Sequence, residues 1–275
     1  MKIQRLVLTA LMLGNLTAEE QPWQNDLTPP APGTFPAIQP CVLDLRVSWK
    51  GMIDSGQLRV EFAPRVATKP GTFIVRSSAA SLGLAAGIFP YQSNFWSEID
   101  AASLKPRLFT AVETDRHETT TSTTRHLDGR IEYAEVTKNL TTDTETRKER
   151  SFKFTPVFDI FSAMLLVRSQ KLDTGDQITL VVNPFGTPYL LRVKVAGREL
   201  HLDHNTIRLS VGMRKIDRNT LELLPYKKLK KDATLWLSDD AERIPIELRA
   251  AVFIGDIRAT LTNYQKFRQP DPGGK

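Results

Sequence analysis

The chain has 275 residues, of which 41% are hydrophobic and 25% charged, and its net charge is +6. These values are ordinary for a soluble globular protein, and past the N-terminus no apolar run is long enough to span a bilayer. The single cysteine, Cys41, excludes an internal disulfide. The mildly basic balance is compatible with anionic partners such as lipid head groups or acidic polymers.

The N-terminal residues are typical of an export signal. Lys2 and Arg5 precede the apolar run 6–13, and Ala18 offers a cleavage site. An ordinary N-terminal strand or helix is the alternative. We expect an exported protein. The expected organisation is a signal peptide (1–18), a Pro-rich linker or ordered arm (19–40), a single β-rich domain (41–264) and a flexible tail (265–275).

The first half of the domain has the alternating pattern of β-strands. Leu43, Leu45 and Val47 alternate with polar residues, and the turn residues that follow predict a hairpin over 42–63. Further elements are expected in chain order: a strand around 73–75, a short helix of small residues within 78–88, a connecting segment with aromatic anchors over 89–106, strands near 108–113, 117–125 and 130–136, and a charged loop or strand end at 142–150.

One clear amphipathic helix is predicted, over about 156–170. Its apolar residues recur at helical spacing, which places Val157, Ile160, Phe161, Met164 and Leu165 on one face. Pro156 suits the first turn and Thr155 suits the N-cap. We expect this helix to pack as a plug against the concave face of a β-sheet.

The second half returns to strands at roughly ten-residue spacing, which predicts an antiparallel meander. The expected strands are 177–182, 189–195, 199–202 and 206–211, then three strands within 233–263. The predicted fold class is therefore mainly β: a curved antiparallel sheet, or a partly open β-barrel or sandwich, with one amphipathic helix packed against it.

Several strings carry a family resemblance. They are residues 45–56, the helix segment Asp159-Ile160-Phe161-Ser162-Ala163, Gly175-Asp176, and Trp236-Leu237-Ser238-Asp239-Asp240 with Arg243 and Pro245. Over roughly 41–264 the chain resembles the bacterial exported family catalogued as domain of unknown function 3108. The resemblance implies a β-rich periplasmic or envelope-associated protein. It supplies no catalytic residues to carry over.

Asp239 and Asp240 are the catalytic candidates. Two adjacent carboxylates suit an acid/base pair or metal ligands, and Arg243 lies close enough in sequence to neutralise them. Aspartate is also a standard turn residue, and this pair stands where two strands must turn. The turn interpretation is the one we favour.

The histidines and Ser162 give weaker signals. His201 and His204 point to opposite faces if both lie on one strand, and they converge only if a turn separates them. Ser162 lacks the nucleophile-elbow sequence and is expected at a helix–sheet contact. No metal site and no cofactor is therefore predicted.

Two basic clusters, Lys227-Lys228 with Lys230-Lys231 and Arg147-Lys148 with Arg150, are expected to be solvated loops. The more specific interpretation is that these clusters contact an anionic lipid or lipopolysaccharide surface peripherally. A nucleic-acid partner is not expected, because the sequence has no recognition motif and the chain carries an export signal.

The leading functional hypothesis is a non-enzymatic envelope protein that binds a hydrophobic or amphipathic ligand, or a partner protein, in the concavity of the sheet. The residues expected at its lining or core are Val157, Phe161, Met164, Trp236 and Phe253. One alternative is a hydrolase or polysaccharide-modifying enzyme that uses the acidic residues near Asp239. Another is a structural or assembly protein that acts through an exposed strand edge.

Overall fold

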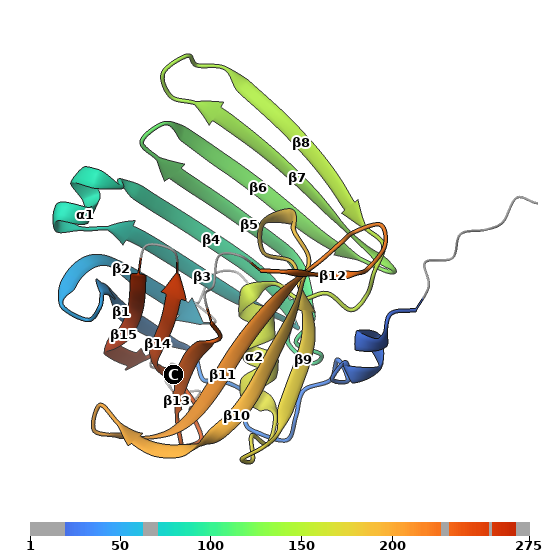
Figure 1. Ribbon diagram of the computed structural model, residues 1–275, viewed down its shortest axis with the longest axis vertical. Helices are drawn as coiled ribbons and strands as arrows, with labels where there is room; N and C mark the ends of the chain where they lie inside the picture. Colours follow the sequence, from blue (N-terminus) through green and yellow to red (C-terminus); the bar gives the residue numbers. More distant parts are fainter. Residues whose placement is uncertain (1–19, 63–70, 227–230, 253–254, 268–275) are drawn as a thin grey trace, which may run out of the picture.

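The computed structural model describes residues 20–62, 71–226, 231–252 and 255–267. Within these ranges the chain forms one antiparallel sheet in the order β8-β7-β6-β5-β4-β3-β2-β1-β15-β14-β13-β11-β10-β9, with β12 paired to β11 (Figure 1). The end strands β8 and β9 do not pair with each other in the described part of the chain. The predicted mainly β fold, a curved antiparallel sheet with a packed helix, is confirmed.

The strands follow the chain with short turns. Their bounds are β1 Cys41–Trp49, β2 Ile53–Phe62, β3 Thr72–Ser81, β4 Tyr91–Asp100, β5 Pro106–Asp115, β6 Glu118–Leu127, β7 Arg130–Asn139, β8 Glu145–Phe152, β9 Gln177–Val182, β10 Tyr189–His201, β11 His204–Ile216, β12 Leu223–Pro225, β13 Ala233–Ser238, β14 Pro245–Val252 and β15 Gly255–Lys266. The helices are α1 Gly83–Ile88 and α2 Ile160–Ser169, with short 3-10 turns η1 Pro22–Asp26 and η2 Pro184–Gly186.

Most of these strands were predicted from the sequence, and the predictions that failed have a physical cause. The prediction of a connecting segment over residues 89–106 is wrong, because strand β4 spans Tyr91–Asp100. Its buried positions include Ser93 and Ser97, so the apolar alternation that marks a strand is absent there. The charged segment 142–150 contains most of β8. The predicted small-residue helix is confined to α1, because residues 78–81 belong to β3.

Helix α2 begins later than predicted. Its N-cap is Asp159, not Thr155, and Pro156 lies before the helix rather than in its first turn. Asp159 Oδ1 accepts hydrogen bonds from the backbone N–H groups of Phe161 and Ser162, both at 2.8 Å. Ser162 Oγ accepts from the Asp159 N–H at 2.9 Å, which completes a capping box. These bonds satisfy the N–H groups of Asp159, Phe161 and Ser162, so the helix starts at Ile160.

The helix lies against the inner side of the curved sheet and divides the core (Figure 1). Phe161 and Leu165 pack with residues of β1, β2 and β5, such as Leu43, Phe62 and Phe109. Another set of helix residues packs with β9, β10 and β11; it consists of Ala163, Leu166 and Val167. The predicted plug against a curved sheet is therefore present, and Phe161 is buried.

The Pro-rich segment before β1 packs onto this core. The Trp23 ring is buried beside Phe152 and Val157, and its Nε1–H donates to the Leu221 carbonyl at 2.9 Å. Ile38 joins the cluster that contains Phe161. The predicted signal segment, residues 1–18, and the residues after 267 lie outside the described residues.

Candidate functional site

The residues predicted at the lining of a ligand cavity or in the core are mostly core residues. Val157, Phe161 and Trp236 are buried, and Met164 is partly buried. Val157 belongs to the cluster around Trp23, whereas Phe161, Met164 and Trp236 share the cluster around Phe109. The fifth predicted residue, Phe253, lies outside the described residues.

The C-terminus of α2 is held by a buried arginine. The Arg243 guanidinium donates to the carbonyl oxygens of Arg168 at 2.9 Å and Lys171 at 2.8 Å, and also to that of Gln170. The Phe35 ring lies over this guanidinium, 3.2 Å from ring centroid to Cζ. Burial lowers the pKa of Arg243 to about 10, so the group is charged at neutral pH and matches the negative end of the helix dipole.

A second arginine makes the reciprocal contacts from the helix. Arg168 is buried on α2 and donates to the carbonyls of Pro36 at 3.0 Å and Glu242 at 2.8 Å. The Pro-rich segment before β1, which we call the arm, crosses the end of α2 at this point. The Gly33 N–H donates to Ser169 Oγ at 2.9 Å. A Cβ on Gly33 would lie 2.1 Å from the Ser169 carbonyl oxygen, so only glycine fits. We call these contacts the helix clamp.

The two catalytic candidates have structural partners. Asp240 Oδ1 accepts from Ser238 Oγ at 2.8 Å and from the N–H groups of Glu242 and Arg243 at 2.9 and 3.0 Å. It therefore shapes the turn that carries Arg243. Asp239 instead pairs with Arg198, Nε to Oδ2 2.9 Å. The Arg243 side chain binds the helix carbonyls rather than neutralising the acidic pair.

His201 and His204 stand opposite each other across a tight turn, in direct register between β10 and β11. His201 Nε2 lies 2.7 Å from Glu247 Oε2, which occupies one of its two ring nitrogens. Among the described residues no group of three or more His, Cys, Asp or Glu is arranged to hold a metal ion. Ser162 serves the capping box of α2.

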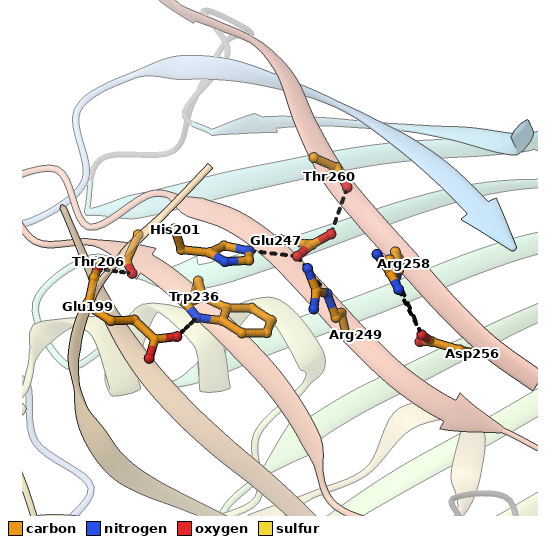
Figure 2. A network of polar contacts seen from close by, with 9 residues as sticks. All are labelled: Glu199, His201, Thr206, Trp236, Glu247, Arg249, Asp256, Arg258 and Thr260. Atoms are coloured by element: carbon orange, nitrogen blue, oxygen red, sulfur yellow. Dashed lines mark hydrogen bonds and ion pairs between the residues drawn. The ribbon is translucent and has the colours of Figure 1, made fainter. Parts of the chain in front are cut away.

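Around Glu247, β10, β13, β14 and β15 contribute a polar cluster that sequence reasoning did not find (Figure 2). The Glu247 side chain is 3% exposed, and besides His201 it binds Arg249 Nε at 2.8 Å and Thr260 Oγ1 at 3.2 Å. The His201 ring stacks on Trp236 at 4.1 Å with an interplanar angle of 10°, and Trp236 Nε1 donates to Glu199 at 2.7 Å.

The pairing register extends this cluster across the sheet. Ala259 and Leu261 on β15 pack into the core with Phe161, so Thr260 between them faces the opposite side, which we call the outer face. One cross-strand row runs along that face, each residue paired with the next: Glu247, Thr260, Arg46, Gln57, Ala80 and Gln92.

The row ends in a groove on the outer face of β1 to β4. The groove has a volume of about 620 Å³. Its exposed side chains are polar and carry charges, amides or a hydroxyl group. They are Arg46, Asp54, Gln57, Arg59, Ser78, Gln92 and Asn94. The charged residues form ion pairs, Arg59 with Asp44 at 2.9 Å and Arg46 with Asp54 at 3.4 Å. We call this hollow the outer groove.

The inner side of the sheet offers less space. A hollow of about 240 Å³ lies between the arm and α2, lined by apolar residues that include Phe35, Phe73 and Leu165. Small-molecule sites have volumes of about 300–1,000 Å³. The outer groove falls in that range and this inner hollow does not.

Among the described residues, no helix is both long and apolar enough to cross a membrane.

Residues 44–262 match the family described as Protein of unknown function (DUF3108). The chain belongs to this family. The matched range contains α2, the two arginines of the helix clamp and the outer groove. In this DUF3108 member, the strings that carried the resemblance have structural roles: Asp159 and Ser162 cap the start of α2, and Asp240 and Arg243 hold its end.

A solved structure shares the fold of this DUF3108 member. It is the β-barrel-like protein of domain of unknown function DUF1849 from Brucella abortus, with a TM-score of 0.53, 9% identity, and coverage of 85% of this chain and 100% of that one. Two others align less well. A candidate lipoprotein from Parabacteroides distasonis has a TM-score of 0.32, 6% identity and coverage of 86% and 99%. A candidate exported protein with a YmcC-like fold from Bacteroides fragilis has a TM-score of 0.29, 5% identity and coverage of 86% and 100%. No curated protein matches the chain.

Proposed function

We propose that this DUF3108 member is a non-enzymatic, exported binding protein of the bacterial envelope, which holds an amphipathic ligand with its polar part in the outer groove. One observation carries the proposal. The outer groove is about 620 Å³ and rich in exposed polar groups, whereas the hollow beside α2 is about 240 Å³. The proposal places recognition on the face opposite the helix, not in the concavity that the helix fills.

The groove's chemistry favours a polar group without net charge. Its two arginines, Arg46 and Arg59, are both paired with aspartates, so the pairs add no net charge. The side-chain amides of Gln57, Gln92 and Asn94 make no hydrogen bond within the described residues, and all three are exposed. Amide donors and acceptors at a concave surface suit the hydroxyl groups of a sugar head group or a zwitterionic head group.

Export is supported by the N-terminal pattern of Lys2, Arg5 and the apolar run 6–13. These residues lie outside the described residues. A binding role is favoured over hydrolysis, because Asp240 Oδ1 holds a turn and Asp239 is paired with Arg198.

A titration with dodecyl maltoside below its micelle concentration tests the proposal, because that probe joins an uncharged sugar head to an alkyl chain. The variant Gln57→Ala/Asn94→Ala removes two exposed amides from the outer groove. We expect its affinity to fall by about tenfold or more, since each lost hydrogen bond is worth about 1 kcal/mol. Gln177→Ala, which removes an exposed amide from β9, should bind like wild type. Equal affinity in all three proteins would contradict the proposal.

A further inference from the structure

Two neighbouring segments at one end of the sheet expose large apolar side chains. The first is the β1–β2 turn, residues 49–53, and the second is α1 with its flanks, residues 82–91. Figure 1 shows α1 beside the turn that joins β1 and β2, and the Leu82 N–H donates to the Ser55 carbonyl at 3.0 Å. Leu84 is 81% exposed, Met52 77% and Phe89 68%. We call these two segments the apolar tip.

These side chains protrude from well-supported backbone. The Arg116 guanidinium donates to the carbonyl of Gly87 at 2.5 Å, which holds the end of α1. The Tyr91 N–H donates to Ser81 Oγ at 2.9 Å, which fixes the start of β4. The exposure of Leu84 and Phe89 therefore comes from a fixed conformation. A contiguous exposed apolar patch on such a support marks an interaction surface.

The two segments of the apolar tip carry a positive charge of their own. Residues 49–53 and 82–91 contain one basic residue, Lys50, and no aspartate or glutamate. Of the acidic residues next to them, Asp54 binds Arg46 and Asp256 binds Arg258 at 3.2 Å. Glu113 accepts a hydrogen bond from the Tyr91 hydroxyl group at 2.5 Å, and Asp115 accepts from the N–H groups of His117 and Glu118. Arg116 adds a second cation beside α1.

We propose that the apolar tip inserts into the surface of an anionic lipid bilayer. The protruding apolar residues enter the interface, where apolar surface is removed from water. Lys50 and Arg116 meet anionic head groups, an attraction worth about 1 kcal/mol per cation near the surface. Trp49 and Tyr91 border the apolar residues, and aromatic residues with a polar atom are enriched at that depth.

Insertion also fits the position of the outer groove. Leu82 lines the groove and belongs to the apolar tip. A bilayer that covers the tip would therefore lie next to one end of the groove. The insertion itself does not depend on what the groove binds, so the two proposals fail separately.

A site-specific fluorophore tests insertion in the full chain. Cys41 is buried, and burial raises the pKa of its thiol to about 12, so it does not react with the label. The variant Leu84→Cys carries an environment-sensitive dye at the tip. Leu127→Cys carries it at the far end of β6, at a residue that is 40% exposed and about 30 Å from Glu118, the first residue of that strand.

With vesicles of phosphatidylethanolamine and phosphatidylglycerol, we expect the dye at position 84 to shift to shorter wavelength and the dye at 127 to stay unchanged. Phosphatidylcholine vesicles should bind at least about tenfold more weakly, because the cations lose their partners. Lys50→Glu should reduce binding to the anionic vesicles. No shift at 84 would overturn the proposal. A shift at 84 that needs no vesicles and grows with protein concentration would also overturn it, because it would assign the tip to a second copy of the chain.

Discussion

At the scale of single residues, Arg243 has a role that its place in the sequence does not reveal. Its guanidinium satisfies the last carbonyls of a helix that precedes it by more than 70 residues. The carbonyl groups at a helix C-terminus have no partner within the helix. When such groups are buried, an arginine fork can satisfy several of them at once.

Replacing Arg243 should therefore destabilise the whole domain. We expect Arg243→Ala to lower the free energy of unfolding by about 3 kcal/mol, because buried carbonyls lose charged donors. The melting temperature should fall by roughly 6–12 °C, as calorimetry can measure. Arg198→Ala is the matched control, since it breaks the exposed pair with Asp239 and should cost less than about 1 kcal/mol. Similar melting of both variants would remove Arg243 from the helix clamp.

At the scale of elements, α2 is the segment on which the two sides of the core depend. One set of its side chains packs with β1, β2 and β5, and another packs with β9, β10 and β11. Asp159 begins the helix as its N-cap and is itself buried, where it accepts a hydrogen bond from Ser97 Oγ at 2.5 Å. Burial raises the pKa of the Asp159 carboxyl group, and its hydrogen bonds offset that cost.

A charge on the buried face of α2 should prevent folding. We expect Phe161→Asp to cost more than about 5 kcal/mol, from lost burial beside Phe109 and from a carboxylate without partners. That loss approaches the whole stability of a typical domain. Phe89→Asp provides the control, because this phenylalanine is exposed and its replacement should leave the melting temperature within about 2 °C of wild type. Cooperative melting of the Phe161 variant near the wild-type temperature would contradict the central place of α2.

At the scale of the whole molecule, the sequence predicts the sheet and the helix because both have apolar periodicity. The alternation of Leu43, Leu45 and Val47 predicts β1, and the helical spacing of Phe161 and Leu165 predicts α2. Where inward positions carry serine, as in β4, the pattern disappears and the strand is missed. The buried position of Trp23 could not be predicted either, because a Pro-rich segment carries no periodic signal.

The candidate site was hidden for a different reason. Gln57 and Asn94 occupy outward positions of strands, where polar residues are expected whether or not they bind anything. They lie in one groove only because β2 and β4 both pair with β3 in a register that places the two residues near each other. Glu247 and His201 are 46 residues apart and meet through the order of β10, β13 and β14. Sheet order and register are long-range properties that cannot be inferred from local patterns in a single sequence.

The account rests on recognition at the outer groove rather than beside α2. The most direct test follows both regions in one nuclear magnetic resonance titration with dodecyl maltoside. We predict shifts in the side-chain amide signals of Gln57 and Asn94, because these groups contact the bound head group, and none in the methyl signals of Leu165 and Leu166 on the buried helix. Shifts in the two leucines with unchanged amide signals would contradict the account and place the ligand in the interior of the sheet.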